Sequence, residues 1–264
     1  MTSLSESHIE GNLLLKALND DDRALVAPHL EREVYKKGET LFEAGSDVSY
    51  ISFPCEQTVV TLVIAMRDGR TAETATIGRE GAVGGVVSDG RLPASTQALI
   101  QIAGPVLRME ALKLQDLQQR SVSLRNLFTR YADCLLAQVL QAGACNALHP
   151  IEQRCLRWLL TLQDRIGSDA LPVTHELLAS MLGVQRTYLT RILRSLQVQG
   201  LIKVGRGRIT ILDPAGAERS ACECHGSVKR HFEVVLGAVY GEAGRIVEID
   251  PPADPGQARR RKAS

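Results

Sequence analysis

The segment from Thr174 to Leu212 constrains the fold of this chain most, because its residues mark two short helices followed by a hairpin. Thr174 stands where a hydroxyl caps a helix, and Gly183 follows that helix where a positive φ angle allows a tight turn. A second helix is predicted from about Gln185 to Gln199, with Gly200 ending it. The alternating run LIKVGRGRITIL then predicts a hairpin with a basic tip. Together these signals predict a winged helix-turn-helix.

Charge separates this segment from the front of the chain. The whole sequence has a net charge of only +1, yet residues 1–118 carry 11 basic and 17 acidic side chains. Thr174 to Leu212 carries one acidic side chain, Glu176, against six basic ones: Arg186, Arg191, Arg194, Lys203, Arg206 and Arg208. A small module with such an excess of cations has the electrostatic footprint of a phosphate-binding surface. We therefore expect this end of the molecule to face double-stranded DNA.

The second predicted helix has one apolar face, formed by Leu189, Ile192, Leu193 and Leu196, so its polar side chains lie elsewhere on the helix. In a major groove, Arg bonds guanine and Thr bonds a base or contacts a thymine methyl. We predict DNA contacts from Gln185, Arg186, Thr187, Thr190, Arg191 and Arg194 in the helix and from Arg206 and Arg208 in the hairpin. Helix pairs of this kind also occur as mere packing elements, but the hairpin and the regional charge favour DNA binding.

A β domain is predicted in front of this module. From Glu33 to Met109 the sequence consists of short apolar runs separated by Gly, Asp and Pro turn signals, and the runs Thr58 to Met66 and Gln97 to Ile102 are typical of strands. Their spacing indicates a meander, jelly roll or barrel. The segment from Asn12 to Leu30 has helical spacing. The expected fold class is therefore α+β.

A long helix is predicted between the two modules, because Leu112 to Leu148 contains no proline and only one glycine. Apolar positions recur there at alternating steps of four and three, the seam of a helix that supercoils with a partner. The predicted homodimer interface consists of Leu124, Phe128, Tyr131, Leu135, Gln138 and Ala142. The alternative is that this stripe packs on the protein's own β domain, and the pattern alone gives the two interpretations similar weight.

The domain organisation follows from these segments. We expect a jelly-roll-like β-roll, a dimerisation helix, a winged helix-turn-helix and a C-terminal helix with a basic tail, at residues 1–118, 119–148, 149–225 and 226–264. The chain beyond Glu242 ends in PPADPGQARRRKAS, a composition that favours disorder. The cluster from Arg259 to Lys262 is interpreted as solvated in preference to a contact with the DNA backbone.

Composition also bounds the compartment and the class of protein. The first residues lack a basic start and a long apolar run, and no stretch of about 18 apolar residues occurs. We therefore expect a cytoplasmic protein with no membrane partner. Six scattered cysteines fit free thiols in a reducing compartment. No nucleophile elbow, P-loop or paired-ligand metal motif is present, so an enzyme is not expected.

The order of β domain, long helix and winged helix resembles the Crp/Fnr family of transcription factors over roughly residues 10–225. The most specific match is LGVQRTYLTRILRSLQVQGLI, from Leu182 to Ile202, with Arg186 and Arg191 five residues apart. Weaker matches are Gly38-Glu39, Phe42, Gly45 and the stretch Gly78 to Gly85. The resemblance implies a homodimer that binds a two-fold symmetric operator and contacts RNA polymerase.

Two departures from the family pattern bear on the ligand. Members that bind cyclic AMP have a Gly-Glu pair and an Arg-Ser-Ala run, which appear here as Gly84-Gly85 and as Ala94-Ser95-Thr96. Without that Arg the cyclic phosphate loses a strong charge-assisted contact, so cyclic AMP is not expected as the ligand. Arg91 lies nearby in the sequence but is a weak candidate to replace the missing Arg. A cyclic dinucleotide remains an open alternative. The candidate effector pocket comprises Gly81, Gly84, Gly85, Ser95, Thr96 and Tyr131. Thr187 replaces a family Glu that accepts from cytosine, so a different operator is expected.

The cysteines and histidines bear on whether the protein binds an iron–sulfur cluster, a metal ion or haem. Cys55 is the first cysteine and stands alone, so no iron–sulfur cluster is expected. The run Cys222, Cys224, His225 and the pair of Cys134 with Cys145 suggest metal binding or redox sensing, but without an evident fourth ligand we favour structural thiols and no metal. A haem ligand among His8, His29, His149 and His175 has no distinguishing context. The alternative function is a ligand-sensing signalling module that acts through protein partners, and activator and repressor roles remain equally open.

Overall fold

The N-terminal part of the molecule is a β-roll with short helices in front of it. The computed structural model describes residues 5–68, 71–84, 93–241 and 244–252. The leading helices are α1 (Glu6–Ile9), α2 (Leu13–Lys16) and α3 (Asp20–Val26), followed by the 3₁₀ turn η1 (Ala27–His29). Asn12 and Asn19 cap α2 and α3, since their side chains accept hydrogen bonds from Leu15 N and Asp22 N.

Two antiparallel sheets form the β-roll. The first has the order β1-β7-β3, with β1 (Glu31–Tyr35), β7 (Gly104–Glu110) and β3 (Tyr50–Pro54). The second has the order β2-β6-β4-β5, with β2 (Thr40–Phe42), β6 (Gln97–Ile102), β4 (Val59–Ala65) and β5 (Thr71–Ile77). Val106 of the first sheet packs with Val60, Ile77 and Ile100 of the second, so the two sheets share a core. The predicted β domain and its strand-like runs are confirmed.

The predicted continuous helix is interrupted once. Helix α4 (Ala111–Arg120) ends at Ser121, whose backbone is extended, and α5 (Val122–Leu148) begins directly after it. The hydroxyl of Ser121 accepts a hydrogen bond from Leu124 N, which makes Ser121 the cap of α5. None of the described helices has the length and apolarity needed to cross a membrane.

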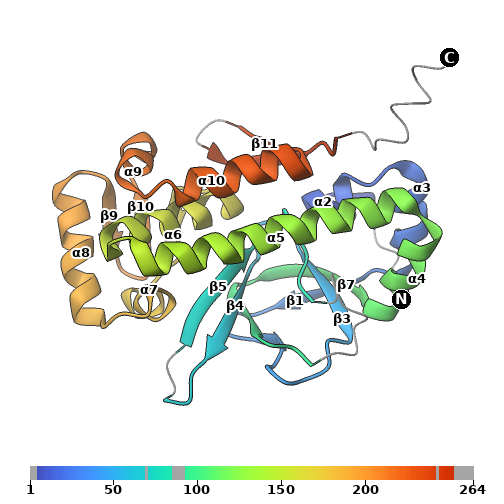
Figure 1. Cartoon of the computed structure of the whole chain (residues 1–264), viewed down its shortest axis with the longest axis horizontal. Helices are drawn as coiled ribbons and strands as arrows, with labels where there is room; N and C mark the ends of the chain where they lie inside the picture. The colour runs from blue at the N-terminus through green and yellow to red at the C-terminus, as the bar shows by residue number, and fades with distance from the viewer. Residues whose placement is uncertain (1–4, 69–70, 85–92, 242–243, 253–264) are drawn as a thin grey trace.

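Helix α5 lies across its own β-roll, and this corrects the predicted dimer seam (Figure 1). Leu124, Phe128, Tyr131 and Gln138 are buried within the chain, and Leu135 and Ala142 are partly buried. The Phe128 ring meets Phe53 of β3 edge-on at 6.1 Å between centroids. The stripe therefore packs on the same chain, because the β-roll and the C-terminal segment supply the apolar surface that a second copy was expected to supply.

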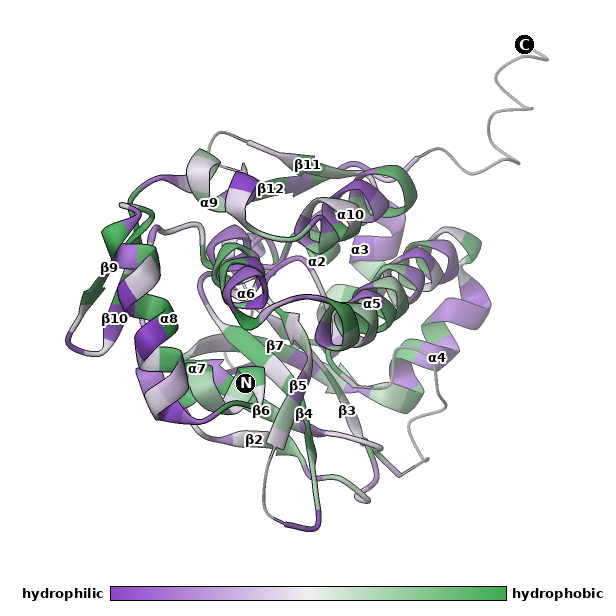
Figure 2. Ribbon diagram, turned by 60° about the vertical axis from the view of Figure 1, so that its left-hand side comes forward, coloured by the Kyte–Doolittle hydropathy of each residue, from purple (hydrophilic) through white to green (hydrophobic). Residues whose placement is uncertain are grey.

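The winged-helix elements gather at the end of the molecule away from α4, as Figures 1 and 2 show. They are α6 (Ile151–Ile166), β8 (Ala170–Leu171), α7 (His175–Leu182), α8 (Arg186–Val198), β9 (Ile202–Gly205) and β10 (Arg208–Ile211), with the sheet order β8-β10-β9. Trp158, Leu189 and Ile209 belong to their shared core. Val59 and Val63 of β4 join the same core, so the module packs directly on the β-roll.

The C-terminal segment returns along α5. It comprises α9 (Pro214–Ser220), α10 (Cys224–His231), the π-helical turn η2 (Phe232–Leu236) and the hairpin of β11 (Ala238–Tyr240) with β12 (Ile246–Ile249). Phe232, Ile246 and Ile249 are buried in the core that holds the N-terminal helices. The two isoleucines of β12 bury against that core, so the chain up to Ile249 is packed. The run PPADPGQARRRKAS, for which disorder is predicted, lies outside the described residues from position 253 on. The basic cluster from Arg259 to Lys262 lies outside the described residues.

Candidate DNA-binding surface and the polar core behind it

The helix-turn-helix forms as its caps and glycines predict. The Thr174 hydroxyl accepts a hydrogen bond from Leu177 N at 3.2 Å, which caps α7. Gly183 and Gly200 end α7 and α8 with φ angles of +68° and +75°, a conformation that side-chain-bearing residues rarely adopt. Leu189 and Leu193 are buried, so α8 is held by its apolar face and presents its polar face outward.

The predicted reading residues lie on that outward face. Gln185, Arg186, Thr187, Arg191 and Arg194 are exposed, and Thr190 is half-buried. Thr190 Oγ1 donates to the backbone oxygen of Arg186 at 2.9 Å, so part of its bonding capacity is already used. The Arg191 guanidinium lies 5.5 Å from the centroid of the Tyr188 ring, a cation–π contact. Tyr188, which sequence reasoning omitted, is exposed beside the arginines and orients one of them.

The hairpin adds a second group of cations. Arg208 pairs with Gly205 in the register of β9 and β10, and Gly207 turns the chain with a φ of +71°. Arg206 and Arg208 are exposed at this tip. Within the described part of the chain, the three arginines of α8 and these two form no ion pair with a carboxylate. Their positive charges therefore face solvent and are available to an anionic ligand.

His175, at the start of α7, adds no charge to this surface at neutral pH. Burial, together with the positive charge of Arg186, lowers the pKa of His175 below its ordinary value. Its Nδ1 lies 3.5 Å from Thr190 Oγ1, between the two helices of the motif. The neutral ring therefore acts as a polar spacer between α7 and α8.

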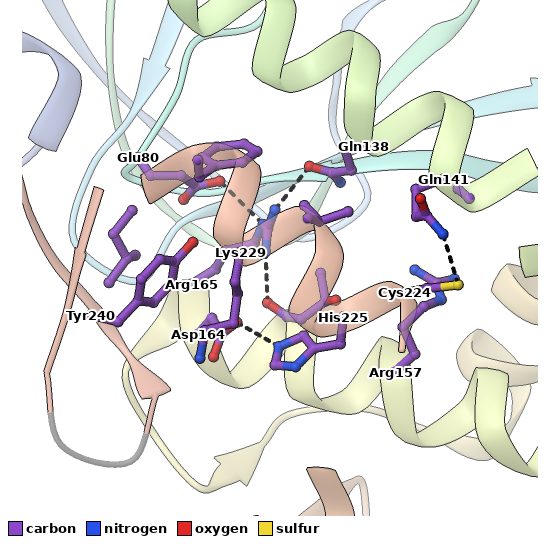
Figure 3. A pocket seen from close by; sticks show the side chains of 15 residues that line it. Glu80, Gln138, Gln141, Arg157, Asp164, Arg165, Cys224, His225, Lys229 and Tyr240 are labelled. Carbon is purple, nitrogen blue, oxygen red and sulfur yellow. Dashed lines mark hydrogen bonds and ion pairs between the residues drawn. The ribbon is translucent and has the colours of Figure 1, made fainter. Parts of the chain in front are cut away.

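A buried polar core behind this surface joins the winged helix to the rest of the chain (Figure 3). The guanidinium of Arg165, on α6, donates to Thr76 O of β5 at 2.8 Å and to Gln138 Oε1 of α5 at 2.9 Å. Arg165 Nε also lies 3.1 Å from Glu80 Oε1, and the two side chains are only 8% and 4% exposed. Gln138 Nε2 in turn donates to Thr76 O. One cation thus connects three elements that are far apart in the sequence.

Further contacts hold the same junction. Trp158 of α6 donates from Nε1 to the carboxylate of Glu73 on β5, and Thr76 Oγ1 donates to the other carboxylate oxygen at 2.6 Å. Burial raises the pKa of Glu73 above its ordinary value, although both donors and nearby arginines oppose the shift. On the C-terminal side, His225 Nε2 lies 2.8 Å from Asp164 Oδ2 of α6. The winged helix is therefore fastened both to the β-roll and to α10.

Two residues of the predicted effector pocket, Gly81 and Tyr131, lie in contact, and the pocket as a whole stays a prediction. The Tyr131 hydroxyl donates to Ala82 O at 2.8 Å, and a Cβ built on Gly81 would lie 2.4 Å from that hydroxyl, so Tyr131 fills the space beside Gly81. Gly84 has a φ of +85°. Ser95 is exposed and Thr96 is half-buried. Gly85 and Arg91 lie outside the described residues.

A small cavity lies in the polar core, lined by residues that include Gln138, Asp164, Arg165, His225 and Tyr240 (Figure 3). Its volume is about 30 Å³. A cavity of that size has room for about one or two water molecules and none for a nucleotide. The polar core is therefore a structural junction in this conformation.

Comparisons with known proteins agree with this architecture. Residues 153–219 match the Crp-like helix-turn-helix domain. No curated protein matches the chain in sequence.

Three solved structures illustrate the likeness in fold. A CRP-family transcriptional regulator from Thermus thermophilus is 21% identical with a TM-score of 0.61, over 72% of this chain and 96% of that one. FixK2 from Bradyrhizobium japonicum is 15% identical with a TM-score of 0.65, over 73% and 98%. The c-di-GMP responsive global regulator CLP from Xanthomonas campestris is 18% identical with a TM-score of 0.59, over 74% and 100%. The chain therefore has the fold of these Crp/Fnr-type regulators, and its residues 153–219 form a Crp-like helix-turn-helix domain that follows the β-roll in the sequence.

Proposed function

We propose that this protein regulates transcription by binding a two-fold symmetric DNA operator as a homodimer, with α8 in the major groove and the β9–β10 hairpin on the backbone. The observation that carries the proposal is the set of exposed arginines, on α8 and at the hairpin tip, that no carboxylate of the described chain neutralises. Phosphates supply the missing counter-charge, and α8 supplies hydrogen-bonding groups for base edges. RNA polymerase belongs to the proposal as a protein partner, on the family resemblance.

The test separates base contacts from phosphate contacts. Operator sequences are first selected from random DNA, and affinity for them is then measured at several salt concentrations. We expect the logarithm of affinity to fall linearly with the logarithm of salt concentration, because bound phosphates release counterions. Arg186→Ala is expected to relax the base preference at one position of each half-site, whereas Arg120→Ala, at an exposed site on α4, is expected to change nothing.

Two results would count against the proposal. Affinity that does not respond to salt would show that phosphates are not bound, and would favour a module that acts through protein partners. An Arg186→Ala variant that loses affinity equally for every sequence would remove that residue from base recognition.

The dimer half of the proposal uses the face of α5 that the chain leaves free. Leu136 and Leu140 are 55% and 64% exposed, and a Cβ on Gly143 would meet no atom within 4 Å. These positions, four and three residues apart, lie on one face of the helix. Large exposed apolar side chains beside an open glycine fit a close approach of the same helix from a second copy, and a two-fold operator requires such a copy.

Sedimentation equilibrium tests this interface. The paired substitution Leu136→Glu with Leu140→Glu is expected to give a monomer that binds the operator more weakly, because like charges then oppose each other across the axis. Val234→Glu, at another highly exposed apolar site, serves as the matched control and should leave the dimer intact. A doubly substituted protein that still forms dimers would place the interface elsewhere.

A further inference from the structure

Four potential metal ligands converge where α5 ends and α10 begins. Cys145 and His149 lie four residues apart at the C-terminal end of α5, joined by the backbone hydrogen bond from His149 N to Cys145 O. Cys222 and Cys224 come from the segment that leads into α10. The ligand atoms of all four side chains lie within 4.8 Å of one another. Two segments separated by more than seventy residues thus bring three thiols and one imidazole to a single point.

Two of the distances between ligand atoms match those of a tetrahedral zinc centre, and the whole set lies within 4.8 Å. Zinc–sulfur bonds of about 2.3 Å and zinc–nitrogen bonds of about 2.0–2.1 Å place neighbouring ligand atoms about 3.4–3.8 Å apart. Cys145 Sγ lies 3.5 Å from Cys222 Sγ, and Cys224 Sγ lies 3.5 Å from His149 Nδ1. A disulfide would require sulfurs about 2.05 Å apart, and all three cysteines are free.

The surroundings support metal binding through His149 Nδ1. Its other ring nitrogen, Nε2, lies 3.3 Å from Glu223 Oε1, the carboxylate contact that orients ligating histidines in metal proteins. Gln141 Nε2 donates to Cys224 Sγ at 3.1 Å, a bond suited to a thiolate that carries negative charge.

The burial of the cysteines and a nearby positive charge also favour metal binding. Cys145, Cys222 and Cys224 are at most 5% exposed and form a small core of their own. Three thiolates with Zn²⁺ would carry one net negative charge, and Arg154 lies near enough to interact electrostatically with Cys145 and Cys222. A buried site with four protein ligands leaves no open coordination position, which is the pattern of structural zinc sites.

We propose that Cys145, His149, Cys222 and Cys224 bind one structural zinc ion. Binding replaces the three thiol protons with the metal, so it releases up to three protons to solvent. His149 is followed directly by Pro150 and then by α6, the first helix of the winged-helix module. The ion would therefore lock the C-terminal segment onto the end of α5 at the point where the chain enters that module. The proposal does not depend on DNA binding.

The sequence run that first suggested a metal differs from this set. His225 is absent from it, because its Nε2 is engaged by Asp164 at 2.8 Å. Cys134 lies apart from it, beside the backbone oxygen of His231. The fourth ligand is His149, which no local sequence pattern distinguishes from the other histidines.

Metal analysis of the unaltered full-length protein is the first test. Protein purified without chelators is expected to contain about one zinc per chain. After zinc is exchanged for Co²⁺, the visible spectrum should show intense tetrahedral d–d bands and sulfur-to-metal charge transfer. No zinc and no tetrahedral cobalt spectrum would overturn the proposal, as would iron with acid-labile sulfide or a Cys145–Cys222 disulfide in the isolated protein.

Variants then assign the ligands. Cys222→Ser with Cys224→Ser should reduce zinc content at least tenfold, while Cys134→Ala, which removes a buried thiol outside the site, should retain it. Because the double variant removes buried groups and risks misfolding, Glu223→Ala offers a milder test at an exposed side chain. It should weaken zinc binding in chelator competition by roughly tenfold or more. Glu233→Ala is its exposed control, and equal zinc affinity of the two variants would contradict the role of His149 Nδ1.

Discussion

Replacing Arg165 by Met is the most informative perturbation of the interdomain junction. Met retains much of the apolar volume of the Arg stem but removes the guanidinium. That group makes hydrogen bonds to Thr76 O, Thr161 O and Gln138 Oε1 and an ion pair with Glu80. The variant therefore leaves the Glu80 carboxylate buried without its cation and removes one donor from each of these three acceptors.

The size of the effect follows from burial. Both charged side chains are less than a tenth exposed, so solvent screens their interaction little. Removing one partner of a buried, hydrogen-bonded ion pair costs about 3–5 kcal/mol, since the other charge stays desolvated. Small domains are stable by only about 5–15 kcal/mol, so Arg165→Met should lose a large share of the free energy of unfolding.

Trp158 supplies the assay, because it is the one tryptophan of the chain and lies at the same junction, bonded to Glu73. Denaturant unfolding followed by its fluorescence gives the free energy of unfolding of four proteins: the unaltered chain, Arg165→Met, Glu80→Gln and the double variant. We expect the double variant to lose clearly less than the sum of the two single losses, because the pair is then removed together. Additive losses, or an Arg165→Met loss below about 1 kcal/mol, would refute the reasoning.

Three further predictions concern other parts of the molecule. Burial raises the pKa of Glu73, so above about pH 4.5 the Glu73 carboxyl keeps its proton in the folded chain more than in the unfolded chain. The free energy of unfolding should therefore fall as pH rises through that range. In a pH series of denaturant unfolding, Glu73→Gln should abolish this slope. A stability that rises with pH at this site would contradict it. Burial raises the pKa of Cys55 to about 11 and that of Cys134 and Cys155 to about 12, so a thiol reagent at neutral pH should modify these three only after unfolding, as mass spectrometry would detect. The paired substitution Arg206→Ala with Arg208→Ala removes two cations per chain and four per proposed dimer, so it should reduce the slope of log affinity against log salt by about 4 in magnitude without altering the preferred DNA sequence. An altered preference would give the hairpin a base-reading role.

Local sequence signals predicted local structure well. The cap at Thr174, the glycine turn at Gly183 and the basic hairpin each depend on neighbouring residues, and the structure has all three. The β domain was predictable for the same reason, since strand runs and turn residues alternate within short windows. Local patterns of this kind fix which elements form, but they leave the partners of an apolar face undetermined.

Contacts between residues far apart in the sequence could not be predicted from these local signals. The apolar stripe of α5 is real, yet periodicity cannot distinguish a second helix from the chain's own β-roll, and the C-terminal segment that covers part of α5 was expected to be partly disordered. Arg165 belongs to the winged-helix module and Glu80 to the β-roll, and neither lies in a sequence motif that would indicate their ion pair. Cys145 and His149 gain meaning only when Cys222 and Cys224 are brought beside them by folding.

Gln138 connects the long helix, the winged-helix module and the β-roll through two hydrogen bonds. It lies on α5, accepts from Arg165 of α6 and donates to Thr76 of β5, so a shift of α5 against the β-roll must disturb the bonds that hold α6. Gln138→Leu keeps a side chain of similar size but breaks both bonds. It should therefore change Trp158 fluorescence and operator affinity while leaving the dimer intact, because the free face of α5 is untouched. If sedimentation shows that the variant dissociates, Gln138 contributes to self-association after all; if neither fluorescence nor affinity changes, the polar core does not control the position of the winged helix.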